Sequence, residues 1–259
     1  MRGTAVLTTL EVGRLALAEC CVRLQPMRIY LIRHADPNYA TDSITPTGEL
    51  EAARLGERMA GEDLTALYAS PLGRAQQTAG HIARAADLPI ATLDWTAELG
   101  QLRCELPPHG ERCMWDADGS DHRAGAFSRD PASWQQCYPE HAPAVQPAYD
   151  AMVSASDAWL ALQGFERDGH HYRVTRENRD RNAVVCHNGF GLLWLAHLLH
   201  IPLPLVWGNF WLPTTSVTTI LFDERGAVAT PRALCVGDTS HLFAARLPIL
   251  PNGIKNNYD

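Results

Sequence analysis

Short apolar runs alternate with helical segments along most of this chain, and this alternation restricts its fold more than any other feature. The runs are aliphatic and have the length of buried strands. Strands that alternate with helices favour a parallel sheet with helices on both faces. We therefore predict an α/β fold, a three-layer α/β/α sandwich with a mostly parallel central sheet. The predicted strands lie at 28–32, 64–69, 89–93, 183–187 and 216–222.

Two predicted helices begin with the same local pattern, a hydroxyl residue followed by proline. Thr45-Pro46 and Ser70-Pro71 both fit an N-cap with proline at the first helical position. Small and apolar residues at helical spacing follow each pair, so each helix has a face suited to packing on a sheet. Further predicted elements are helices at 149–162 and 192–199, a loop or hairpin at 165–181, and a turn at 188–189.

The 259 residues fit one large domain or two small ones. We expect residues 27–259 to form a single domain with a cap-like insertion at about 101–142, where prolines, glycines, aromatics and charges interrupt the alternation. Charged residues within 1–26 argue against a signal peptide or a membrane span. Our hypothesis is that native translation starts at Met27 and that 1–26 is an upstream extension. The alternative is a short surface helix.

Charge and cysteine content limit the classes of partner. The formal net charge of −7 argues against nucleic acid or an anionic membrane as the main partner. An anionic substrate would therefore need a local cluster of Arg and His. The seven cysteines include no Cys-x-x-Cys pair, which fits reduced thiols in a cytoplasmic protein. The sequence predicts no particular oligomeric state.

Polar side chains recur at one structural position, at or just beyond the carboxyl end of a predicted strand. Arg33 and His34 follow the first strand, and Arg74 lies in the first turn after the second. Glu98 follows the third strand, and His187 ends the late buried one. Open α/β sheets bind ligands at this edge. Because the planar fork of Arg matches phosphate oxygens, we predict a phosphate site there.

The motifs around these residues support a resemblance to a known family. They are Leu31-Ile-Arg-His34, Ile44-Thr-Pro-Thr-Gly48, Ala69-Ser-Pro-Leu-Gly-Arg-Ala-Gln-Gln-Thr78, Glu98, Val185-Cys-His-Asn-Gly189 and Val236-Gly-Asp-Thr-Ser-His-Leu242. Together they resemble the histidine phosphatase superfamily, the phosphoglycerate-mutase-like fold, and its phosphatase branch in particular. The resemblance runs from about residue 27 to about residue 245.

The resemblance implies a set of roles. In this family a histidine at the position of His34 attacks phosphorus and becomes a phosphohistidine, and a carboxyl group at the position of Glu98 serves as acid and then as base. A cationic pocket can replace the usual magnesium, so no metal or other cofactor is expected. The expected catalytic residues are His34, Glu98, His187, Arg33 and Arg74, and the expected substrate-binding residues are Arg33, Arg74, His187, Asn188 and Thr45.

The expected activity is hydrolysis of a phosphomonoester, with a small phosphorylated metabolite as the partner. The mutase continuation Gly-Glu-Ser-x-x-Asn is absent after Arg33-His34, and Ala35-Asp-Pro-Asn-Tyr-Ala40 stands there instead, which favours a phosphatase. The alternatives are a phosphoglycerate-mutase-type phosphotransferase and a non-catalytic phospho-ligand binding protein. Rival carboxylates for the role of Glu98 are Asp94, Glu105 and Glu111.

Three other patterns have competing interpretations. His197 and His200 have a spacing that could bind a metal, but no third ligand is evident. Gly189-Phe-Gly191 resembles the start of a dinucleotide fingerprint, but Trp194 stands at the third glycine position. Aromatic residues of the expected insertion could cap a pocket or cover the core, and these are Trp115, Trp134 and Tyr138.

Overall fold

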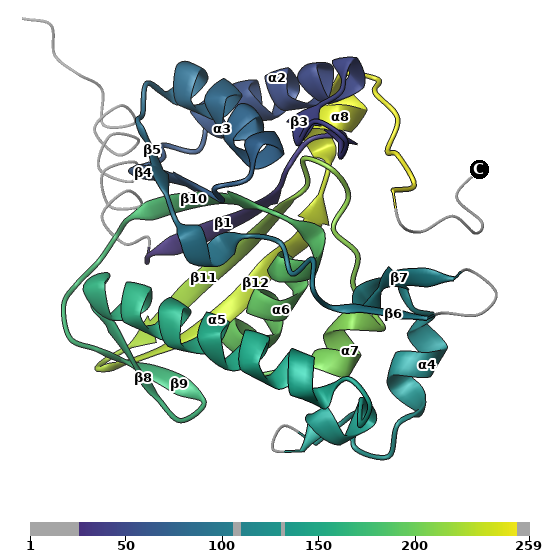
Figure 1. The fold of residues 1–259 in the computed structure, drawn as a ribbon. Helices are drawn as coiled ribbons and strands as arrows, with labels where there is room; N and C mark the ends of the chain where they lie inside the picture. Colours follow the sequence, from purple (N-terminus) through teal and green to yellow (C-terminus); the bar gives the residue numbers. More distant parts are fainter. Residues whose placement is uncertain (1–25, 106–109, 131–132, 253–259) are drawn as a thin grey trace, which may run out of the picture.

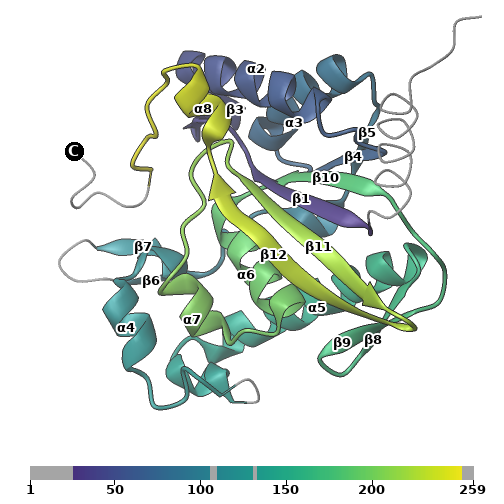
Figure 2. The same ribbon diagram turned by 180° about the vertical axis from the view of Figure 1, so that it is seen from behind.

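The structure is a computed structural model that describes residues 26–105, 110–130 and 133–252, so the proposed upstream extension lies almost entirely outside the described residues. An eight-stranded sheet separates two layers of helices (Figures 1 and 2). In spatial order its strands are β5 (Ile90–Thr92), β4 (Ala66–Ala69), β10 (Arg181–Cys186), β1 (Arg28–Arg33), β11 (Val217–Arg225), β12 (Val228–Asp238), β9 (His171–Val174) and β8 (Phe165–Asp168).

The α/β architecture is confirmed, but the sheet is mixed and not mostly parallel. β5, β4, β10 and β1 are parallel to one another. The remaining pairs, from β1–β11 to β8–β9, are antiparallel. Two of these four pairs follow from chain connection, because β11–β12 and β8–β9 are hairpins with short turns, and such turns join only antiparallel strands. Gly226 and Gly169 adopt positive φ in these two turns.

The pleat of β1 divides the core into two clusters. Ile29 and Leu31 face one side of the sheet, and Tyr30 and Ile32 face the other. The first pair packs toward the layer of α5, α6 and α7, and the second packs against α2 and α3, with α8 beside α2 (Figure 1). The bounds are α2 (Pro46–Ala60), α3 (Gly73–Ala86), α5 (Ala142–Leu162), α6 (Asn188–Leu199), α7 (Leu203–Trp207) and α8 (Ser240–Ala244).

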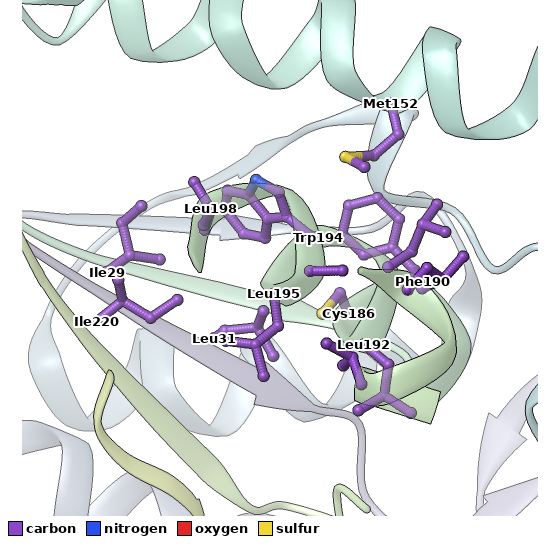
Figure 3. Packing of buried hydrophobic residues seen from close by; sticks show 14 of the residues in the cluster. Ile29, Leu31, Met152, Cys186, Phe190, Leu192, Trp194, Leu195, Leu198 and Ile220 are labelled. Atoms are coloured by element: carbon purple, nitrogen blue, oxygen red, sulfur yellow. The ribbon is translucent and has the colours of Figure 1, made fainter. Parts of the chain in front are cut away.

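Helix α6 is buried on nearly all sides, between the sheet and α5 (Figures 1 and 3). Its Trp194 indole donates to Ser156 Oγ of α5 at 2.8 Å, which satisfies the buried N–H group. The helix begins at Asn188, so the predicted turn at 188–189 is wrong. The helix starts early because the Glu98 carboxylate accepts two of its first N–H groups.

The two predicted N-caps have different outcomes. Thr45 caps α2, because its Oγ1 accepts from Gly48 N at 3.0 Å. Ser70 caps no helix: α3 begins at Gly73 after Leu72, which has no capping side chain. Ser70 instead continues the sheet, and its N–H donates to Val185 O at 2.9 Å. The hydroxyl–proline pattern is the same at both places, but Thr45 directly precedes its helix, whereas Ser70 still pairs with the sheet.

The segment expected to form an insertion contains short elements that pack beside α6 and α7 (Figure 1). Trp115 and Trp134 are buried in the larger core cluster, and Tyr138 packs on Trp207 with ring centroids 5.6 Å apart, which favours the core interpretation of these aromatics. α5 begins at Ala142, earlier than predicted. The other short elements are β2 (Pro37–Asn38), β3 (Ser43–Ile44), η1 (Asp94–Thr96), β6 (Arg103–Glu105), β7 (Glu111–Cys113), η2 (Met114–Asp116), α4 (Gly119–Ala124) and η3 (Trp134–Cys137).

The charged segment after α5 folds as the predicted hairpin, β8–β9. The late strand β11 is confirmed and extends to Arg225, whereas its long partner β12 was not predicted. None of the helices described here combines the length and apolar character needed to cross a membrane.

Candidate active site

His34 lies where the central strand β1 ends. Its N–H donates to Cys186 O of the neighbouring β10 at 2.9 Å, so the residue is fixed by the sheet. The side chain is buried, and Nδ1 lies 2.7 Å from Ala35 O. A carbonyl oxygen only accepts, so Nδ1 carries the proton and Nε2 carries the lone pair. The local backbone therefore fixes the tautomer in which Nε2 is unprotonated.

His187 faces this atom from the end of β10. The two imidazole rings have centroids 5.1 Å apart and are tilted by 58°. His187 is buried, and its Nε2 lies 2.7 Å from Ser70 Oγ at the end of β4. Its Nδ1 is also buried and has no partner among the described residues. Three adjacent parallel strands thus place their ends in one small polar site.

Two buried arginines supply positive charge to the site. Arg74 Nε donates to His34 Nε2 at 3.3 Å, and its Nη1 pairs with Asp42 at 2.5 Å. Arg33 donates through Nη1 to Leu212 O at 2.6 Å, and its guanidinium lies 5.3 Å from the Trp211 ring centroid. The buried Nε of Arg33 has no partner in the described part of the chain. These groups suit an anion placed against His34.

Burial keeps both site histidines uncharged at neutral pH. Burial lowers the pKa of His34 well below its usual value, and the charges of Arg33 and Arg74 lower it further. Burial also lowers the pKa of His187 well below its usual value, and His34 and the two arginines act in the same direction. A neutral imidazole at the position of His34 retains the lone pair that nucleophilic attack requires.

Glu98 follows η1 and reaches the first turn of α6. Its carboxylate accepts from Phe190 N at 2.8 Å and from Gly189 N at 3.2 Å. Burial raises the pKa of Glu98, although these backbone hydrogen bonds and the charge of Arg33 oppose the increase. A carboxyl group with a raised pKa is suited to exchange a proton near neutral pH.

Residues 29–232, which form most of the chain, match the family model of the histidine phosphatase superfamily (branch 1). The chain belongs to this superfamily. This finding confirms the family predicted from the motifs around the two histidines. No curated protein matches the sequence.

Solved structures, among them two named as phosphatases, share the fold of this histidine phosphatase superfamily member. An Entamoeba histolytica phosphoserine phosphatase mutant bound to phosphoserine is 20% identical, with a TM-score of 0.54, covering 83% of this chain and 99% of that one. Bacillus stearothermophilus YhfR is also 20% identical, with a TM-score of 0.53 and the same coverage. The Shigella flexneri alpha-ribazole phosphatase is 22% identical, with a TM-score of 0.52, covering 82% and 97%.

The two remaining predicted site residues of this superfamily member lie in different settings. Asn188 is buried at the start of α6, where its Oδ1 accepts from Leu212 N at 3.3 Å. Its Nδ2 is buried and has no partner among the described residues, so a donor remains for a ligand. The Thr45 hydroxyl instead caps α2 and donates to Asp36 Oδ2 at 2.5 Å. Both of its hydrogen bonds lie within the protein.

Sequence reasoning missed residues that support the site. Asp42 fixes Arg74, and its Oδ2 also accepts from Gly73 N at 2.6 Å. Glu51 is fully buried in α2 and accepts from Asp36 N and from Thr214 Oγ1 at 2.9 and 3.0 Å. Burial raises the pKa of Glu51 to about 7. The sequence could have indicated a buried carboxylate here, because helical spacing places the acidic residue at position 51 on the apolar face of its helix.

The rival carboxylates lie in more exposed positions. Asp94 and Glu105 are exposed, and Glu111 pairs with Arg103 at 3.2 Å on the β6–β7 hairpin. Asp116 was not predicted, although its charge interacts with Arg33 and burial raises its pKa. Among the carboxylates considered from the sequence, Glu98 has the least exposed position and the clearest link to the site.

The remaining sequence patterns are explained by packing and local hydrogen bonds. His197 Nε2 pairs with Asp157 at 2.8 Å. No group of three or more His, Cys, Asp or Glu side chains in the described ranges is arranged to hold a metal ion. Gly189 is needed because a Cβ there would lie 2.6 Å from the Trp115 ring, and a Cβ at Gly191 would lie 2.9 Å from Leu212. These glycines therefore allow close packing around α6.

Proposed function

We propose that this protein is a metal-independent phosphatase that hydrolyses a small phosphomonoester through a phosphohistidine on His34. The observation that carries the proposal is the orientation of His34. Its Nδ1–H donates to the Ala35 carbonyl, and the lone pair of Nε2 accepts from Arg74 Nε at 3.3 Å, a donor that turns to a phosphoryl oxygen when Nε2 attacks phosphorus. A neutral nucleophile beside a fixed cation is the arrangement that phosphoryl transfer needs.

The first step forms a bond between His34 Nε2 and phosphorus while the bond from phosphorus to the ester oxygen breaks. Arg33, Arg74 and His187 bind the three equatorial oxygens, where negative charge is concentrated. Asn188 donates through the free Nδ2. Because two guanidinium groups lie within the site, the protein itself supplies the charge that a metal ion supplies elsewhere.

Glu98 handles the proton in both steps. In the first step the protonated carboxyl gives its proton to the departing oxygen, so the product leaves as an alcohol. In the second step the carboxylate accepts a proton from water, which attacks phosphorus and breaks the P–N bond. The products are inorganic phosphate and a neutral His34, and Glu98 is protonated again.

The substrate class is a small phosphorylated metabolite. Similar folds include a phosphoserine phosphatase from Entamoeba histolytica, also crystallised with 3-phosphoglyceric acid, and a mycobacterial glucosyl-3-phosphoglycerate phosphatase. These names support a phosphatase over a phosphoglycerate-mutase-type phosphotransferase. The presence of His34, Glu98 and both arginines in one site supports an enzyme over a binding protein.

Exchanging Glu98 for Gln is expected to affect substrates according to their leaving group. The kcat/KM of an alkyl phosphate, which reports formation of the phosphohistidine, should fall about 10²–10⁴-fold, because an alkoxide leaves poorly without a proton. The kcat/KM of p-nitrophenyl phosphate should fall by less than about tenfold, because its leaving group needs little protonation. Steady-state kinetics on both esters measures the difference.

The pH dependence gives the same test a second readout. Since the raised pKa of Glu98 keeps it protonated at lower pH in the free enzyme, kcat/KM for the alkyl ester should fall as pH rises through that pKa. This alkaline loss should be absent in the Glu98→Gln variant. Glu111→Gln, which changes an exposed carboxylate, is the matched control. Equal losses on both esters, or the leaving-group effect in the control variant, would assign the acid role to another residue.

A further inference from the structure

Ser70 has a hydrogen-bonding arrangement that its role in the sheet does not require. The residue is fully buried at the end of β4. Its Oγ lies 2.7 Å from Nε2 of His187, which is also fully buried. The same Oγ accepts from Leu72 N at 3.3 Å. Because α3 takes no cap from Ser70, the hydroxyl group is free to serve His187.

A count of protons selects one direction for this hydrogen bond. If His187 Nε2 donated to Ser70, the hydroxyl proton would be buried with no acceptor in the described residues. If Ser70 donates to Nε2, its proton and both oxygen contacts are satisfied. The proton of the neutral imidazole then resides on Nδ1, the one ring nitrogen that lacks a partner.

We propose that Ser70 is a positioning residue that donates to Nε2 of His187 and thereby makes Nδ1–H of His187 a hydrogen-bond donor to the bound phosphoryl group. This inference deepens the proposed function and rests on it. Arg33 Nε and Asn188 Nδ2, which belong to the same site, are also buried donors without a partner among the described residues. A phosphoryl group has acceptors for all three.

The two site histidines then have the same tautomer but opposite roles. His34 uses its Nδ1–H on the Ala35 carbonyl and presents the lone pair of Nε2. His187 uses its Nε2 lone pair on Ser70 and presents Nδ1–H. One ring is therefore a nucleophile and the other a donor, although both are neutral. The two roles differ because the protein binds Nδ1 of one ring, through the Ala35 carbonyl, and Nε2 of the other, through the Ser70 hydroxyl.

The direct test is the tautomer of His187 in the intact protein. Histidine labelled with ¹⁵N distinguishes a protonated from an unprotonated ring nitrogen, and the His187→Asn variant assigns the signal. We expect the Nδ1–H tautomer in the wild type, and a shift of the Nδ1 signal when inorganic phosphate is added. An Nε2–H tautomer in the wild type would overturn the proposal, even where a Ser70 variant fails to fold.

Ser70→Ala supplies the second arm. Its His187 should populate the Nε2–H tautomer, and kcat for p-nitrophenyl phosphate should fall about 10- to 100-fold, as expected for one misdirected donor. Ser156→Ala is the matched control, because it removes another buried serine hydroxyl, bound to Trp194 at 2.8 Å in a different part of the core. An unchanged tautomer in Ser70→Ala would also overturn the proposal.

The two arms separate this inference from the proposed function. The Nδ1–H tautomer and the phosphate response, together with no turnover of any phosphomonoester, would contradict the phosphatase and leave the role of Ser70 in anion binding supported. Turnover that depends on His34, together with the Nε2–H tautomer of His187, would contradict only the role of Ser70.

Discussion

Replacing His34 with alanine is expected to reduce phosphomonoester turnover at least about 10⁴-fold, the scale of loss when a covalent nucleophile is removed. No other side chain in the described site presents a neutral lone pair next to Arg74. The fold should persist, because the variant loses two hydrogen bonds, to the Ala35 carbonyl and from Arg74 Nε, and each has a net contribution of about 1 kcal/mol. Turnover of p-nitrophenyl phosphate and the far-UV circular dichroism spectrum measure the two effects.

His170→Ala is the control for this variant, because His170 is exposed on the β8–β9 hairpin. It should retain wild-type turnover. The assignment of the nucleophile would be refuted by a folded His34→Ala protein that keeps more than a few per cent of the wild-type activity. That level is about two orders of magnitude above the residual activity that we expect.

Replacing Arg74 with alanine is expected to lower kcat about 10²–10³-fold, the usual cost of removing a charge that stabilises the transition state. Arg74 donates directly to His34, the proposed nucleophile, and Asp42 pairs with its Nη1. The variant therefore loses both a phosphoryl ligand and the alignment of the imidazole. Kinetics at saturating substrate separates this loss of kcat from a change in binding.

Arg84→Ala provides a matched control on the same helix, since Arg84 is exposed in the last turn of α3. It should leave kcat unchanged. Asp42→Asn should show an intermediate loss, because the neutral amide still holds Arg74 but with a weaker hydrogen bond. A kcat for Arg74→Ala within about twofold of the wild type would exclude Arg74 from the transition state.

Much of the site could be predicted because its residues follow strand ends. Arg33, His34 and His187 end buried apolar strands that pair in the parallel half of the sheet. Periodicity locates such strands, and parallel pairing brings their carboxyl ends together. The antiparallel half could not be predicted equally well, because β12 is half exposed and contains a proline at position 231, so its apolar pattern is weak.

Contacts between distant residues explain what the sequence left out. The Ser70-Pro71 pair has the local pattern of a helix start, yet its serine binds a histidine 117 residues away. The helix at Asn188 begins where it does because Glu98 accepts its first N–H groups. The residues next to Ser70 and Asn188 in the sequence predict neither interaction, because His187 and Glu98 come from distant parts of the chain.

The most direct measurement is a rapid chemical quench of the wild-type protein during turnover of a ³²P-labelled phosphomonoester. After quenching in alkali, peptide mapping should locate a phosphoryl group on His34 that is stable to base and released by acid, formed and consumed as fast as the substrate turns over. Turnover without such an adduct on His34, or with the adduct on another residue, would contradict the mechanism.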